Sequence, residues 1–77
     1  MKEGYIVWNE STVESEFFGI YRSYEKALRQ LRKVLRNRFG RCPHQEDKVW
    51  DFVSEISDED SYKITPFEEY DGKWEEA

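Results

Sequence analysis

Short apolar runs separated by polar stretches divide the chain into five segments. Residues 5–8 and 17–21 are rich in β-branched and aromatic side chains, which is typical of strands. The polar, acidic stretch between them predicts a hairpin with a long loop rather than a tight two-residue turn. Because both runs are apolar on both faces, we expect one face of the sheet to meet a helix and the other to carry aromatic rings toward solvent or a partner.

The clearest periodic pattern predicts a helix over residues 24–39. Ser23 is a suitable N-cap, and Glu25 lies where the helix dipole favours an acid. Gly40 and the nearby Pro43 indicate the end of the helix. At about 100° per residue the apolar positions fall within an arc of roughly 140°. They are Ala27, Leu28, Leu31, Val34, Leu35 and Phe39.

The second half of the chain predicts one more helix and one more strand. The segment 44–56 fits a helix better than a strand, since its apolar residues share one helical face. Residues 62–65 alternate and predict a third strand that ends at Pro66. Thr65 and Glu68 could instead form a capping box that starts a short helix, and a strand followed by a short helix satisfies both patterns.

The order β-β-α-α-β predicts a small α+β fold with a three-stranded antiparallel or mixed sheet. A right-handed connection from the second strand to the third gives the strand order 2-1-3, with both helices on one face. We expect one domain over residues 1–77, with residues 75–77 frayed. The predicted core consists of Ile6, Trp8, Phe18, Ile20, Leu28, Leu31, Leu35, Val49, Val53 and Ile64.

Composition narrows the class of protein. Hydrophobic and charged residues each make up 38% of the 77 residues, and no apolar run approaches the roughly 20 residues of a bilayer span. The first residues lack the apolar core of a signal peptide, and the single cysteine, Cys42, allows no intrachain disulfide. We therefore expect a cytosolic protein that does not contact a membrane. Aromatic residues, at 17%, either compensate for the few aliphatic ones or form a binding surface.

Charge is distributed very unevenly along the chain. Residues 22–41 carry eight basic side chains and one acid, whereas residues 42–77 carry three basic side chains and twelve acids. Arg38 falls inside the apolar arc of the helix and must either extend to solvent or find an acidic partner. The other basic residues of the helix share an arc of roughly 120° beside the apolar one. This basic face comprises Lys26, Arg29, Arg32, Lys33 and Arg36.

Three interpretations of this charge pattern remain open. The acidic segments can neutralise the basic helix within the molecule. The basic face can bind nucleic acid, although a pI near 4.9 argues against it. The acidic C-terminal third, with its interleaved rings, can bind a protein partner. The residues of that predicted acidic and aromatic surface are Asp58, Glu59, Asp60, Tyr62, Phe67, Glu68, Glu69, Tyr70, Asp71 and Trp74.

The segment Gly19-Ile20-Tyr21-Arg22-Ser23-Tyr24-Glu25-Lys26-Ala27 is similar to a pattern found in small phage and prophage accessory proteins. In those proteins a strand ending in glycine, an apolar residue and an aromatic residue leads into a capped helix. The resemblance covers about residues 5–34. It implies an accessory protein or inhibitor of host defence in the cytoplasm of a bacterial host cell, and it carries no catalytic or binding residue across.

The chain lacks the usual sequence signatures of catalysis. Cys42 and His44 form one Cys–His pair without the second pair that a zinc site needs, and the four glycines are scattered rather than gathered in a phosphate loop. We therefore expect neither an enzyme nor a cofactor or metal site. The preferred hypothesis is a non-catalytic accessory protein or inhibitor of phage or mobile-element type that binds a partner protein through the acidic and aromatic surface. A nucleic-acid-binding protein that uses helix 24–39 and a homo-oligomer, such as a homodimer, joined through the exposed sheet face are the alternatives.

Overall fold

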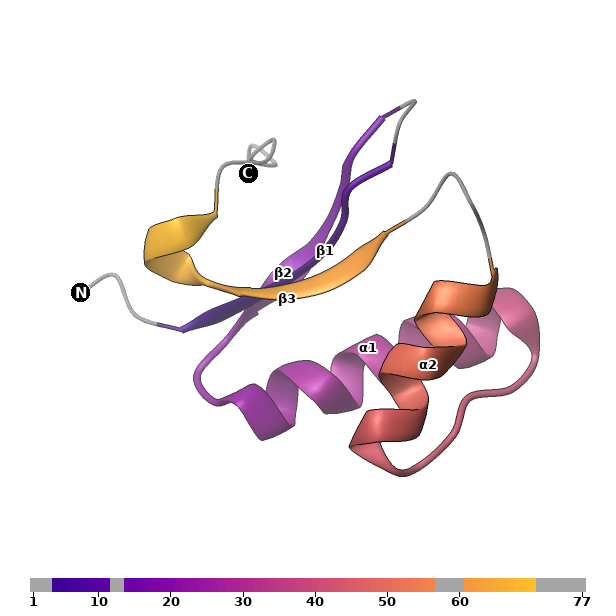
Figure 1. Cartoon of the computed structure of the whole chain (residues 1–77). Coiled ribbons are helices and arrows are strands. Elements are labelled where there is room, and N and C mark those ends of the chain that lie inside the picture. The colour runs from indigo at the N-terminus through magenta and orange to yellow at the C-terminus, as the bar shows by residue number, and fades with distance from the viewer. Residues whose placement is uncertain (1–3, 12–13, 57–60, 71–77) are drawn as a thin grey trace.

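A computed structural model describes residues 4–11, 14–56 and 61–70 of the chain (Figure 1). Its strands are β1 (Tyr5–Asn9), β2 (Glu16–Tyr21) and β3 (Tyr62–Pro66), and its helices are α1 (Tyr24–Phe39) and α2 (Glu46–Ile56). A short 3₁₀ helix, η1 (Phe67–Glu69), follows β3 directly. The predicted α+β fold and element order are confirmed, and the strand and the short helix at the C-terminal side occur in succession.

The three strands form one antiparallel sheet in the order β2-β1-β3, as predicted. The mixed alternative is not realised, because both outer strands run antiparallel to β1. At the centre of the sheet, Val7 lies opposite Gly19 on one side and Ile64 on the other. Figure 1 shows α1 and α2 together on one side of the sheet, with η1 at its other side.

Helix α1 begins and ends at the residues that its sequence predicts. The Ser23 side chain accepts a hydrogen bond from the Lys26 backbone N–H at 3.2 Å. Gly40 adopts a φ of 81°, and its N–H donates to the Arg36 carbonyl at 2.8 Å. Both ends of the helix are therefore fixed by local interactions.

The main core lies between the two helices and the sheet. Leu31, Leu35 and Val49 have no exposed surface, and Val7 of the central strand is equally buried beneath them. Most of the apolar arc of α1 is used here, which confirms the predicted helical faces. The buried members of this cluster are Val7, Ala27, Leu28, Leu31, Val34, Leu35, Val49, Phe52, Val53 and Tyr62.

A bulge in β2 changes which side chains face the helices. Trp8 pairs with Phe17 and Val7 pairs with Gly19, so Phe18 is an extra residue on β2. Phe18 packs against the helix-side core, whereas Ile20 lies opposite Ile6 on the other face and is 43% exposed. The prediction of Ile20 as a core residue is wrong, because simple alternation along β2 does not account for the bulge. Gly19 permits the bulge with a φ of 135°.

The second face of the sheet carries a smaller aromatic cluster rather than open rings. Ile6 and Trp8 are buried there by Tyr70, whose ring meets Trp8 edge-on with centroids 4.9 Å apart. Thr65 accepts a hydrogen bond from the Trp8 indole at 2.8 Å, and η1 has no side-chain cap. The alternative capping box therefore does not form, since the Thr65 hydroxyl is engaged within the sheet.

Candidate functional site

The basic face of α1 is the main concentration of one charge on the described surface. With 3.6 residues per turn, Arg29, Arg32 and Arg36 fall within about 60° of helix rotation and span about 10 Å of helix length. Lys26 and Lys33 continue the basic face on the side away from Arg32. The five cations are thus held on one rigid helix whose opposite face is anchored in the core.

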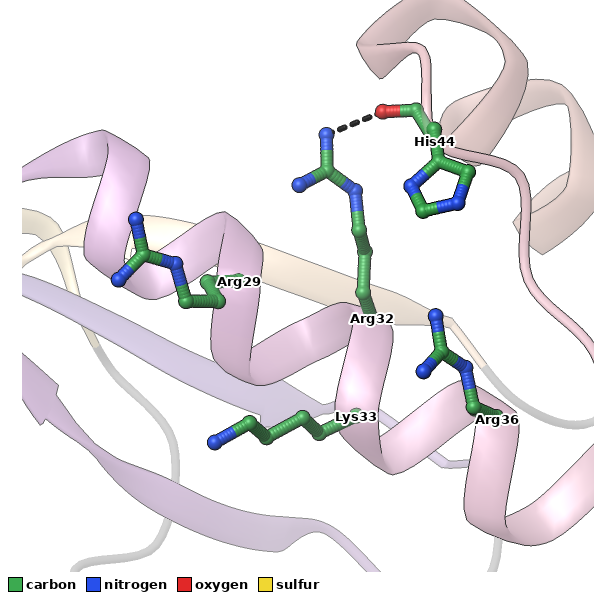
Figure 2. Close-up of a pocket in the computed structure, with 5 residues that line it drawn as sticks. All are labelled: Arg29, Arg32, Lys33, Arg36 and His44. Carbon is green, nitrogen blue, oxygen red and sulfur yellow. Dashed lines mark hydrogen bonds between the residues drawn. The ribbon is translucent and has the colours of Figure 1, made fainter.

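Part of this face forms a shallow hollow of about 180 Å³. Figure 2 shows the side chains of Arg32 and Arg36 directed toward His44, whereas Arg29 and Lys33 extend away from it. His44 belongs to the connection between α1 and α2, so the hollow lies where that connection passes the helix. Within the described chain, the residues that line the hollow are Arg29, Arg32, Lys33, Arg36 and His44.

Arg32 is the most constrained of these side chains. One of its terminal nitrogens donates a hydrogen bond to the backbone carbonyl of His44. Its Nε atom is shielded from solvent and has no hydrogen-bond partner among the residues that the structure describes. A buried donor without a partner costs about 1–3 kcal/mol, so this N–H is a group that an incoming acceptor would stabilise.

The five cations of the basic face are not neutralised by the described part of the protein. Over residues 4–11, 14–56 and 61–70, the ion pairs within 4 Å are Arg38–Glu16 and Lys63–Glu10. The acidic stripe of α2, formed by Asp47, Asp51 and Glu55, is exposed and does not pair with α1. The described acids therefore do not neutralise this face through ion pairs, as the first of the three interpretations of the charge pattern would require.

Arg38 interacts quite differently from the rest of α1. Its two terminal nitrogens each donate to a carboxylate oxygen of Glu16 at 2.7 Å, and one of them also donates to the Tyr62 hydroxyl at 3.0 Å. Its guanidinium lies 5.1 Å above the centre of the Phe18 ring. Of the two predicted outcomes for Arg38, extension to solvent or pairing with an acid, the structure shows the pairing, and its role is to join α1 to two strands.

The same network continues through a buried polar residue. The Asn9 amide donates to Glu16 at 3.0 Å, and its carbonyl oxygen accepts from the Ser61 backbone N–H at 2.9 Å. Hydrogen bonds from Arg38 and Asn9 lower the pKa of Glu16 from 4.5 to about 2. Glu16 is therefore ionised at neutral pH, and the network functions as a structural clamp.

The predicted acidic and aromatic surface does not assemble as one patch in the described residues. Tyr62 is 3% exposed in the helix-side core, and Tyr70 is buried on the opposite face of the sheet. Phe67 is half-buried beside Tyr70, while Glu68 and Glu69 are exposed. The remaining members of this predicted surface, Asp58, Glu59, Asp60, Asp71 and Trp74, lie outside the described residues.

Sequence reasoning identified the basic face but missed His44 as part of the site. The available signal was its position four residues after Gly40, in the short connection that has to turn back along α1. A short connection between packed helices brings its side chains beside the end of the first helix. The helical spacing of the arginines accounts for only one side of the hollow, and the connection that contains His44 forms the other.

Comparisons of the chain with models of protein families, with curated proteins and with solved structures found no match in any of the three. Within the described residues no helix is both long enough and apolar enough to cross a membrane. The same residues contain no group of three or more His, Cys, Asp or Glu side chains placed to hold a metal ion.

Proposed function

We propose that this chain is a non-catalytic binding protein whose binding face is the basic surface of α1. The observation that supports this is a cluster of five cations on one helix that has no acidic partner among the described residues. Unrelieved repulsion on a helix surface is unfavourable for folding, so a partner that supplies the missing negative charge explains it. An accessory role of this kind agrees with what the phage-type segment at residues 19–27 implies.

A partner protein suits the surface better than a nucleic acid. The exposed acidic stripe of α2 begins three residues after His44, which lines the hollow. A long polyanion laid on α1 would pass beside that stripe and be repelled by it, and the net charge of −5 adds to this repulsion. A protein can present acids to α1 and bases to α2, so that mixed charge favours association and fixes orientation.

A binding role rather than a catalytic one is supported by the one thiol. Burial raises the pKa of Cys42, although Arg32 and Arg36 act in the opposite direction. A raised pKa keeps the thiol protonated at neutral pH, whereas a nucleophilic cysteine needs its thiolate form. We therefore assign Cys42 to packing against the helix-side core, which it contacts.

The test is capture of partners from a nuclease-treated bacterial lysate on the immobilised protein. We expect specific proteins to be retained by the native chain and lost by Arg29→Glu with Arg36→Glu. The matched control is Arg22→Glu with Lys48→Glu, which makes the same charge change at exposed positions outside the basic face. Circular dichroism must show that both variants keep the native helix content.

Three outcomes would contradict the proposal. Equal capture by the native chain and the basic-face variant would exclude α1 as the binding face. Loss of all binding after nuclease treatment would favour the nucleic-acid alternative. Loss of capture in Glu68→Lys with Glu69→Lys, but not in the basic-face variant, would move the binding surface to the exposed acids of η1.

A further inference from the structure

We infer that the hollow beside His44 is a subsite for a phosphate group, carried by a phosphorylated side chain of the partner protein. This rests on the proposed function, because it names the group that the basic face recognises. The hollow combines three arginines, one lysine and one histidine around about 180 Å³. That space admits a compact tetrahedral anion, and the residues around it supply more positive charge than a single carboxylate needs.

The kind of cation favours an oxyanion with several oxygens. Arginine presents its N–H donors in a planar fork that matches phosphate and carboxylate oxygens, whereas lysine is a point charge. Arg32 and Arg36 lie about one turn apart and both point toward His44, so they can approach one group from different directions, and Arg29 lines the same hollow about one turn before Arg32. A phosphate monoester offers three such oxygens and close to two negative charges at neutral pH.

Arg32 gives the strongest indication that an acceptor belongs here. Its Nε–H has no partner in the described structure, although another of its nitrogens is already bonded to the His44 carbonyl. Because the Nε atom is shielded from solvent in the free protein, a phosphate oxygen in the hollow can accept from this N–H only when the Arg32 side chain rotates. Binding would then give the Arg32 Nε–H the hydrogen-bond partner that it lacks in the free protein, so this residue would favour the phosphate-bound state.

The surroundings of the hollow favour a single phosphate over a chain of them. The first turn of α2 carries Glu46 and Asp47, directly after the connection that contains His44. These acids limit how far negative charge can extend beyond the hollow. A phosphorylated serine or threonine places one dianion on an otherwise uncharged backbone, whereas a nucleic acid continues its charge in both directions.

Calorimetric titration of the full chain tests this subsite. The probes are inorganic phosphate, free phosphoserine, acetate and a single-stranded deoxythymidine oligonucleotide, all at the same ionic strength. We expect phosphate and phosphoserine to bind with one site, and acetate to bind much more weakly. Arg32→Lys, which keeps the charge but removes the fork, should weaken phosphate binding about tenfold. Arg22→Lys, a matched change on the exposed loop before α1, should leave it unaltered.

Equal binding of acetate and phosphate, or an unchanged phosphate affinity in Arg32→Lys, would overturn the phosphate assignment. Tighter binding of the oligonucleotide than of phosphoserine would assign the hollow to nucleic acid. Failure of phosphate binding together with loss of partner capture in Arg29→Glu with Arg36→Glu would reject the subsite and retain the proposed function. Phosphate binding without any effect of that variant on capture would reject the proposed function instead.

Discussion

Helix α1 carries two kinds of arginine that differ in how their charge is balanced. Near its C-terminal end, Arg38 is held by a bidentate ion pair with Glu16, a hydrogen bond to Tyr62 and the ring of Phe18. Along the adjoining face, Arg29 and Arg36 line a hollow without an acidic partner in the described chain. The same residue type on one helix therefore serves as a clamp in one place and as an open charge in the other.

The difference shows what each region contributes. A paired arginine surrounded by hydrogen bonds joins elements that are distant in sequence, and its loss should appear as lost stability. Unpaired cations spaced three and four residues apart repel one another, so they lower stability slightly while they remain available to a partner. Substitutions in the two regions should therefore change folding in opposite directions.

Substitution of a core residue beneath α1 should have the largest effect on stability, because both kinds of arginine depend on the position of this helix. Leu31 is fully buried between α1 and the sheet, on the turn of the helix that also carries Arg29 and Arg32. Leu31→Ala should lower the free energy of unfolding by about 2–5 kcal/mol, because it leaves a cavity in a thin core. Urea denaturation followed by circular dichroism measures this. An unchanged midpoint would contradict the assignment of this helical face to the core.

Breaking the clamp should have the next largest effect. Glu16→Gln removes the negative charge that Arg38 and Asn9 both bind, and it should lower the free energy of unfolding by about 1 kcal/mol at pH 7. The value is modest because both side chains of the ion pair are 39% exposed and therefore screened. Glu68→Gln, which makes the same charge change at an exposed position, is the control and should have little effect.

The contribution of the clamp should also depend on pH. Because folding lowers the pKa of Glu16 from 4.5 to about 2, its stabilisation is complete above about pH 4.5 and decreases as the pH falls toward 2. The difference in unfolding free energy between the native chain and Glu16→Gln should therefore shrink over this interval. A difference that stays constant from pH 7 to pH 2 would show that ionisation of Glu16 does not contribute.

Removing one open charge should have the smallest effect and the opposite sign. Arg29 has three like charges three or four residues away, at Lys26, Arg32 and Lys33, and only one acid, Glu25, at the same spacing. Arg29→Gln should therefore raise the free energy of unfolding by about 0.5 kcal/mol at low salt, and the gain should fall as salt screens the repulsion. Arg22→Gln controls for the change in net charge. A loss of stability in Arg29→Gln would mean that Arg29 makes a stabilising contact.

The elements and their order could be predicted from the sequence because they depend on local signals. Ser23 and Gly40 fix the ends of α1, and the apolar arc fixes its buried face. Ile20 could not be placed correctly, since the bulge at Phe18 depends on pairing with β1 rather than on the alternation of β2 itself. The second cluster around Trp8 was also not predicted, because it requires η1 to fold back over the sheet.

The candidate site could be predicted only in part for a similar reason. Helical spacing places the five cations on one face, and the position of Arg38 in the apolar arc indicates that it must either extend to solvent or pair with an acid. Neither pattern identifies the acid, which comes from Glu16 on a different element, or the histidine that lines the hollow. Composition alone grouped Tyr62 and Tyr70 with a surface, because it does not reveal the strand register and the short helix η1 that bury them.

The division between clamp and open arginines is tested most directly by an NMR titration with inorganic phosphate, observing the Nε–Hε signal of each arginine. The account predicts progressive, saturable shifts for Arg29, Arg32 and Arg36, which line the hollow. Arg38, whose guanidinium is already occupied by Glu16, and the exposed Arg22 should stay unchanged. Equal shifts at these five arginines, or none at the three of the hollow, would contradict the account.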